Sequence, residues 1–171
     1  MRVLVTGAAG FVGRYLCERL VADHELIAVD RQPGAGIAHA LELPDDAGAR
    51  ALFARTRPEV VFHLAAFSSI ADSELKQEQC RSVNVDGTRS LLRALPAAGG
   101  NCRFIYVSSC AVYGRVAASA QPITERAGGV GVGLREGAVE VDAHLGDQRA
   151  RGLVERFVLR ERVLELAEQR G

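Results

Sequence analysis

The stretch Thr6-Gly7-Ala8-Ala9-Gly10-Phe11-Val12-Gly13 decides the fold of this 171-residue chain. It follows an apolar run at 2–6 and opens a stretch with helical periodicity at 11–21. Gly7 allows a tight turn out of a strand, and Gly10 lets backbone N–H groups approach a pyrophosphate at the helix N-terminus. Gly13 lets that helix pack close to the sheet. The spacing therefore predicts a dinucleotide-binding strand–turn–helix unit.

A carboxylate follows the next apolar run at a distance that suits this unit. The run 26–29 ends at Asp30, 17 residues beyond Gly13. A carboxylate there hydrogen-bonds the ribose hydroxyls of the adenosine and repels a 2′-phosphate, so NAD is favoured over NADP. The neighbouring Arg31 would offset part of that repulsion. The alternative, glycines that serve only a turn, is weaker because both strands and the helix are present.

Apolar strands alternate with helices over the first part of the chain. We predict strands at 2–6, 26–29, 38–43, 59–64 and 103–107, and helices at 11–21, 46–56 and 73–95, the last bending at Asp86-Gly87. Continuous apolar strands between helices are typical of a parallel sheet covered on both faces. The sequence thus predicts a three-layer, Rossmann-like, doubly wound α/β fold with strand order 3-2-1-4-5 and a ligand crevice at the carboxyl ends of the strands.

Composition excludes several classes of protein. Lys+Arg 21 balance Asp+Glu 21, which argues against a nucleic-acid binder. No run approaches the ~18 apolar residues of a membrane span, and the N-terminus does not resemble a signal peptide. The four cysteines are scattered without a C-x-x-C pair, so we expect reduced thiols, no metal site and a cytoplasmic location; they are Cys17, Cys80, Cys102 and Cys110.

Four further segments follow the glycine-rich stretch in order within residues 1–126. They are Glu42-Leu43-Pro44-Asp45, His63-Leu64-Ala65-Ala66, Asn84-Val85-Asp86-Gly87-Thr88 and Val107-Ser108-Ser109-Cys110-Ala111-Val112-Tyr113-Gly114. With the glycine-rich stretch they resemble the motifs of the extended short-chain dehydrogenase/reductases, the NAD-dependent epimerase/dehydratase family. The resemblance implies NAD-linked hydride transfer on a nucleotide-sugar or a similar hydroxylated substrate.

The resemblance also assigns residues to the cofactor and to catalysis. Together with the glycine-loop reasoning, it implies a dinucleotide site formed by Gly7, Ala9, Gly10, Phe11, Val12, Gly13, Asp30, Arg31, Glu42, Leu43, Leu64, Ala65, Ala66 and Asn84. It implies that Ser109 is the catalytic hydroxyl, which would hydrogen-bond the sugar oxygen that gains or loses a proton. The alternative is that Ser108 and Ser109 only cap a loop. For His63, at the end of a buried strand, the plain interpretation is a satisfied packing residue.

The proton-transfer pair of the family, a tyrosine followed four residues later by a lysine, is absent. None of the three tyrosines has that spacing, and the only lysine, Lys76, follows Asp72 instead. Because Glu161-Arg162-Val163-Leu164 resembles the segment after the family's lysine, the pair's positions hold roughly Leu153 and Phe157. Two interpretations stay open: an epimerase/dehydratase-type enzyme with a base supplied by another group or chain, or a non-catalytic NAD-binding module or decayed remnant.

The last quarter of the chain, residues 127–171, departs from the family's pattern. We predict a dinucleotide-binding domain at 1–126, a divergent glycine-rich segment at 127–148 and an amphipathic helix packed on the domain at 149–171. The C-terminal substrate lobe of the family is expected to be missing. The strand 103–107 would then be an open apolar edge, a template for association. We expect either a hairpin from 130–141 or a second chain, through self-association or a partner, to cover it.

Overall fold

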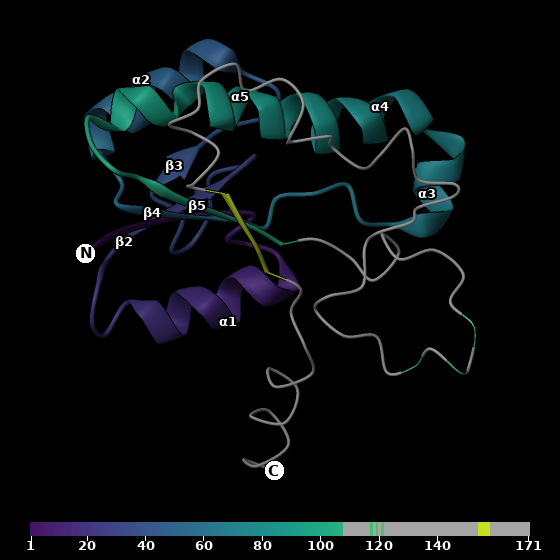
Figure 1. Ribbon diagram of the computed structural model, residues 1–171, viewed down its shortest axis with the longest axis horizontal. Coiled ribbons are helices and arrows are strands. Elements are labelled where there is room, and N and C mark those ends of the chain that lie inside the picture. Colours follow the sequence, from purple (N-terminus) through teal and green to yellow (C-terminus); the bar gives the residue numbers. More distant parts are fainter. Residues whose placement is uncertain (108–116, 118, 120, 122–153, 158–171) are drawn as a thin grey trace.

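The computed structural model describes residues 1–107, 117, 119, 121 and 154–157 (Figure 1). In chain order its elements are β1 (Arg2–Thr6), α1 (Phe11–Leu20), β2 (Glu25–Asp30), β3 (His39–Ala40), α2 (Asp46–Thr56), β4 (Val60–His63), α3 (Ile70–Leu75), α4 (Gln77–Arg81), the π-helical turn η1 (Ser82–Asp86), α5 (Gly87–Ala94), the 3-10 turn η2 (Leu95–Ala98), β5 (Arg103–Val107) and β6 (Val154–Phe157).

The strands form one parallel sheet in the order β3-β2-β1-β4-β5-β6. β1 lies between β2 and β4, with Val3 opposite Leu26 on one side and Val60 on the other. Helix α1 covers one face of the sheet, while α2 and α5 cover the other (Figure 1). The predicted parallel α/β fold and the order of its first five strands are confirmed. The carboxyl ends of β1, β2 and β4 consequently meet at one edge of the sheet.

Each face of the sheet has its own core, which explains the continuously apolar strands. Along β1 the side chains alternate: Val3 and Val5 pack in the cluster toward α1, and Leu4 packs in the opposite cluster. In that opposite cluster the largest side chains, Phe53 of α2 and Phe104 of β5, are fully buried. Strand β1, which leads into the glycine turn, is therefore packed on both faces.

Two predicted elements differ in extent. β3 has two residues instead of the six at 38–43, because Leu41 and Leu43 turn into the core and Pro44 has no N–H for a ladder. The predicted helix 73–95 begins earlier, at Ile70, where the hydroxyl of Ser69 caps α3 by accepting from the N–H of Asp72 at 3.2 Å. The expected bend at Asp86-Gly87 lies at the junction of η1 and α5.

The predicted helix 149–170 is wrong over residues 154–157. These residues form β6, which pairs in parallel with β5, Phe104 opposite Val154 and Val107 opposite Phe157. The physical reason is that the backbone N–H and C=O groups along the edge of β5 would otherwise be unpaired, and they offer hydrogen bonds to an extended segment. In the described part of the chain, β6 thus covers the edge that we assigned to a 130–141 hairpin or a second chain. That hairpin and the rest of the predicted helix lie outside the described residues.

Candidate functional site

The turn after β1 has room only for glycine at its two packed positions. Gly7 has φ +70°, and a Cβ on it would lie 2.7 Å from the amide nitrogen of Ala65. A Cβ on Gly13 would overlap the carbonyl oxygen of Gly7. The N–H of Gly10 donates to that same carbonyl at 3.0 Å and closes the turn. The glycine spacing therefore produces a tight turn pressed against the segment after β4.

Helix α1 begins directly at this turn and presents its N-terminus to the carboxyl edge of the sheet. Its N-cap, Gly10, makes no side-chain cap bond, and its first turn holds no acidic residue. The amides of Phe11 and Val12 belong to the turn that lacks intrahelical acceptors, and these residues are 68% and 38% exposed. Such a terminus attracts an anion through its N–H groups and the helix dipole.

Asp30 ends β2 beside the glycine turn. One carboxylate oxygen, Oδ2, accepts from the N–H of Ala9 at 2.9 Å, and Oδ1 accepts from the N–H of Arg31 at 2.8 Å. Each oxygen keeps a further lone pair for another donor. The carboxylate therefore braces the glycine turn, a role that the sequence did not reveal, and lies at the carboxyl end of β2, where a ribose contact was expected.

The segment after β4 lies against the glycine turn at the same carboxyl edge of the sheet. The N–H of Leu64 donates to the carbonyl oxygen of Thr6 at 3.2 Å, and the N–H of Ala65 donates to the Thr6 hydroxyl at 3.3 Å. Ala66, the next residue, is exposed. The structure thus brings together the glycine turn, Asp30 and residues 64–66, which the sequence assigned to one site.

Other predicted site residues have different surroundings. The side chain of Asn84 is engaged with the backbone of Phe67: Oδ1 accepts from its N–H at 2.7 Å and Nδ2 donates to its carbonyl at 3.2 Å. Asn84 therefore holds the loop after β4. Leu43 is buried against Gly87 in the core, whereas Glu42 is exposed near the carboxyl end of β3.

His63, the last residue of β4, is buried and hydrogen-bonded through both ring nitrogens. Nδ1 lies 2.7 Å from the Thr6 hydroxyl, and Nε2 lies 3.0 Å from the Thr88 hydroxyl. Burial lowers the pKa of the imidazole to about 4, so the ring is neutral at pH 7. The packing interpretation of His63 is confirmed. Its two partners could not be read from the sequence, because they lie on separate elements far along the chain.

The predicted catalytic residue Ser109 and the neighbouring Tyr113 lie outside the described residues. So does Leu153, whereas Phe157 belongs to β6. Among the residues that the structure describes, no group of three or more His, Cys, Asp or Glu side chains is placed to hold a metal ion. Within the same residues no helix is long and apolar enough to cross a bilayer.

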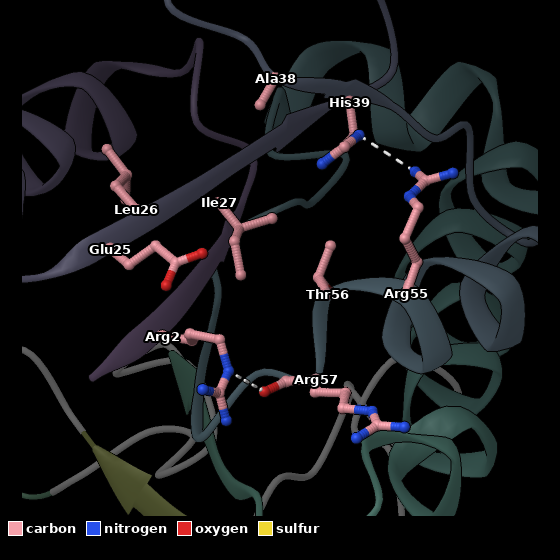
Figure 2. A pocket seen from close by; sticks show the side chains of 9 residues that line it. All are labelled: Arg2, Glu25, Leu26, Ile27, Ala38, His39, Arg55, Thr56 and Arg57. Carbon is pink, nitrogen blue, oxygen red and sulfur yellow. Dashed lines mark hydrogen bonds between the residues drawn. The ribbon is translucent and has the colours of Figure 1, made fainter.

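A separate cavity of about 570 Å³ lies near the amino-terminal ends of β1 and β2 (Figure 2). Its lining residues include Arg2, Arg55 and His39. The Nε of Arg2 donates to the carbonyl oxygen of Arg57 at 2.7 Å, and Nη2 of Arg55 donates to Nδ1 of His39 at 3.1 Å. Because Arg2 and Glu25 begin β1 and β2, this cavity lies at the opposite end of the strands from the glycine turn and Asp30.

A parallel sheet of this order, with a glycine turn leading into a helix N-terminus and an acidic residue ending β2, defines a Rossmann-type nucleotide-binding fold. The chain belongs to the NAD dependent epimerase/dehydratase family, whose model matches residues 3–130.

Relatives of known activity support this membership. GDP-6-deoxy-D-mannose reductase of Pseudomonas aeruginosa is 37% identical over 126 residues, covering 72% of this chain and 39% of the relative. UDP-glucose 4-epimerase of Brucella ovis, solved in complex with NAD, has a TM-score of 0.67 at 27% identity and covers 75% and 41% of the two chains. RMD of Pseudomonas aeruginosa, complexed with NADPH, has a TM-score of 0.62 at 34% identity, covering 74% and 42%. The chain thus spans about two fifths of the length of these relatives.

Proposed function

We propose that this chain binds NAD at the carboxyl edge of its sheet and serves an epimerase/dehydratase-type reaction on a nucleotide-sugar or a similar hydroxylated substrate. The observation that carries the proposal is the junction of the glycine turn with Asp30 and with the segment after β4. Three segments distant in sequence meet there around an exposed helix N-terminus. That arrangement suits a ligand with both a pyrophosphate and a ribose.

The residues at the crevice fit the parts of a dinucleotide. The first turn of α1, at Gly10, Phe11 and Val12, would hold the pyrophosphate, because its amides have no intrahelical acceptors. Asp30 would accept from ribose hydroxyls while it keeps the amide of Ala9. Residues 64–66 would line the nicotinamide side, and the exposed Glu42 would border the adenine. When bound, NAD supplies the acceptor for a hydride from the substrate.

Selection of NAD over NADP follows from charge. The Asp30 carboxylate, half-buried at the end of β2, would repel a 2′-phosphate. The exposed Arg31 beside it would attract one, which reduces the discrimination. Relatives are solved with NAD and with NADPH, and for this chain the argument for NAD is the charge of Asp30.

The second candidate function is a non-catalytic dinucleotide-binding module. It is favoured by the absence of any Tyr-x-x-x-Lys spacing in the sequence. The only lysine, Lys76, is exposed at the end of α3, and the residue four positions before it is Asp72 instead of a tyrosine. For the enzyme, Ser109 is the hydroxyl that we propose to contact the substrate oxygen.

Calorimetric titration of the 171-residue chain with NAD and NADP tests the binding proposal. We expect NAD to bind more tightly, and Asp30→Ala to weaken NAD and to narrow its advantage over NADP. Asp23→Ala removes an exposed carboxylate from the turn after α1 and serves as the matched control, with unchanged affinities. If titration of the folded chain with NAD and with NADP gives no heat of binding, the proposal is contradicted. Turnover of UDP-glucose, followed by chromatography of the sugar product, separates the enzyme from the module.

A further inference from the structure

A continuous chain of hydrogen bonds crosses the buried end of the sheet through His63. The imidazole is 2% exposed and lies between two hydroxyls, those of Thr6 on β1 and Thr88 on α5. The Thr88 hydroxyl lies 2.7 Å from the carbonyl oxygen of Asn84, and the Thr6 hydroxyl lies 3.3 Å from the amide nitrogen of Ala65. This series of hydrogen bonds therefore runs from the backbone amide of Ala65 at one end to the backbone carbonyl of Asn84 at the other.

The two ends fix the direction of every bond between them. The carbonyl of Asn84 only accepts, so the single hydroxyl hydrogen of Thr88 points to it, and Thr88 must accept from Nε2–H of His63. A neutral imidazole with its hydrogen on Nε2 has a lone pair on Nδ1. The Thr6 hydroxyl donates to that lone pair and accepts from the N–H of Ala65. Only the Nε2–H tautomer satisfies all four bonds.

The surroundings of the ring support one neutral, fixed orientation. The rings of Phe104 and Tyr106 lie 5.7 and 5.8 Å from the imidazole, centroid to centroid, and no salt bridge between described residues involves His63. Burial holds the pKa of the imidazole at about 4. An apolar side chain at this position would leave the hydrogen of the Thr6 hydroxyl without its buried acceptor and the Thr88 hydroxyl without its buried donor, which is costly.

The series of hydrogen bonds links three segments: the glycine turn, the segment after β4 and the turn η1. Thr6 immediately precedes the glycine turn, and Ala65 lies against Gly7 in the segment after β4. At the other end, η1 is a π-helical turn, in which the N–H of Gly87 donates to Ser82 O five residues back. From this turn the Asn84 side chain reaches both backbone groups of Phe67 and so holds the far end of the same loop. Isolated π turns are frequent at functional sites.

We propose that His63, as the Nε2–H tautomer, is a positioning residue of the dinucleotide crevice that sets the distance between the glycine turn and the loop 64–67. It touches no ligand. It acts through Thr6 on the amide of Ala65, and through Thr88 on the carbonyl of Asn84. The inference rests on the proposed dinucleotide site and adds how that site is held in shape.

The tautomer is tested first, on the whole chain without dinucleotide. Ring nitrogen correlations in an ¹⁵N-histidine NMR spectrum at pH 7 should show the hydrogen of His63 on Nε2. In Thr88→Val the acceptor is lost, and we expect the amides of Ala65 and Phe67 to exchange with solvent at least tenfold faster. Thr88→Ser, which keeps the hydroxyl, should restore slow exchange. A hydrogen on Nδ1, or unchanged exchange in Thr88→Val, would overturn the proposal.

The second test measures NAD affinity by calorimetry. We expect Thr88→Val to weaken NAD by about three- to tenfold and Thr88→Ser to retain it. Leu91→Ala, which truncates a fully buried neighbour on α5 outside the hydrogen-bonded chain, is the control for general destabilisation; the folded variant should bind NAD like the unchanged protein. If Leu91→Ala and Thr88→Val weaken NAD binding equally, His63 only stabilises the fold and does not position the dinucleotide site. Absence of NAD binding by the unchanged chain would overturn the proposed function, whereas the tautomer and exchange measurements still decide the positioning role.

Discussion

Replacing Gly7 by alanine should destabilise the protein more than any positive-φ strain explains. At φ +70° an L residue pays roughly 1–2 kcal/mol for the left-handed conformation. Alanine also restricts the unfolded chain, which returns about 0.4–1 kcal/mol. The added Cβ would lie 2.7 Å from Ala65 N and 2.8 Å from Leu64 C, both backbone atoms that cannot rotate away. Overpacking of this kind adds about 1–3 kcal/mol, so we expect a total loss of about 2–4 kcal/mol.

Two other glycines separate the clash from the strain. Gly99 has φ +76° and open space where a Cβ would stand, and Gly100 has open space without a positive φ. In urea denaturation we expect Gly99→Ala to lose at most about 1.5 kcal/mol and Gly100→Ala to gain about 0.4–1 kcal/mol. The midpoints can be compared if the slope m is the same in all three variants.

The outcome decides whether the turn after β1 is held against the loop after β4. If Gly7→Ala loses about 1–3 kcal/mol more than Gly99→Ala, the contact with Ala65 is real. Equal losses in the two variants would refute the reasoning, since strain alone would then account for both. NAD affinity of the folded Gly7→Ala variant should also fall, because the crevice must open to admit the methyl group.

Three further predictions concern single side chains. Asp30→Asn should lower the free energy of unfolding by about 1–2 kcal/mol in thermal denaturation, because it weakens the hydrogen bonds that the amides of Ala9 and Arg31 donate to a charged acceptor. An unchanged melting temperature would contradict the stabilising role of Asp30 at the glycine turn. The free energy of unfolding should fall as the pH drops from about 6.5 to 4, because His63 takes up a proton there in the unfolded chain but not in the folded one, where its pKa is lowered to about 4. The expected decrease in the free energy of unfolding is on the order of 3 kcal/mol. It should be absent in His63→Gln. Phe104→Ala should cost about 3–5 kcal/mol by calorimetry, because its ring is fully buried, and a smaller loss would mean that the site collapses.

The elements of this fold could be predicted where the signal is local. The glycine spacing at 7, 10 and 13 and the apolar run before it predicted β1, its turn and α1 within a residue. The helix Asp46–Thr56 was predicted with its bounds, and the structure adds a local cap that the prediction did not use: the side chain of Asp45 accepts from the N–H of Gly48. Helical and strand periodicities need only neighbouring residues, so they can be read from the sequence alone.

Where a distant partner decides, the structure overturned one prediction, the helix over 154–157, and added contacts to two residues whose cofactor roles stay predictions. Residues 154–157 have apolar positions at helical spacing as well as β-forming side chains, and the edge of β5 decides for the strand. Asn84 was assigned to the cofactor, but the backbone of Phe67, 17 residues away, occupies its amide group. Asp30 was expected at a ribose, and the amide of Ala9 shows a second use for the same carboxylate.

The sequence by itself determined the alternation of strands and helices, the glycine turn and the acidic end of β2, because each is encoded in a few adjacent residues. Only the tertiary structure decided how the crevice is held. Thr6, His63 and Thr88 are ordinary residues in their own segments, and their bonds span separations of 57 and 25 positions. Such a chain forms because the sheet buries the imidazole and a buried polar group must find its partners wherever the fold brings them.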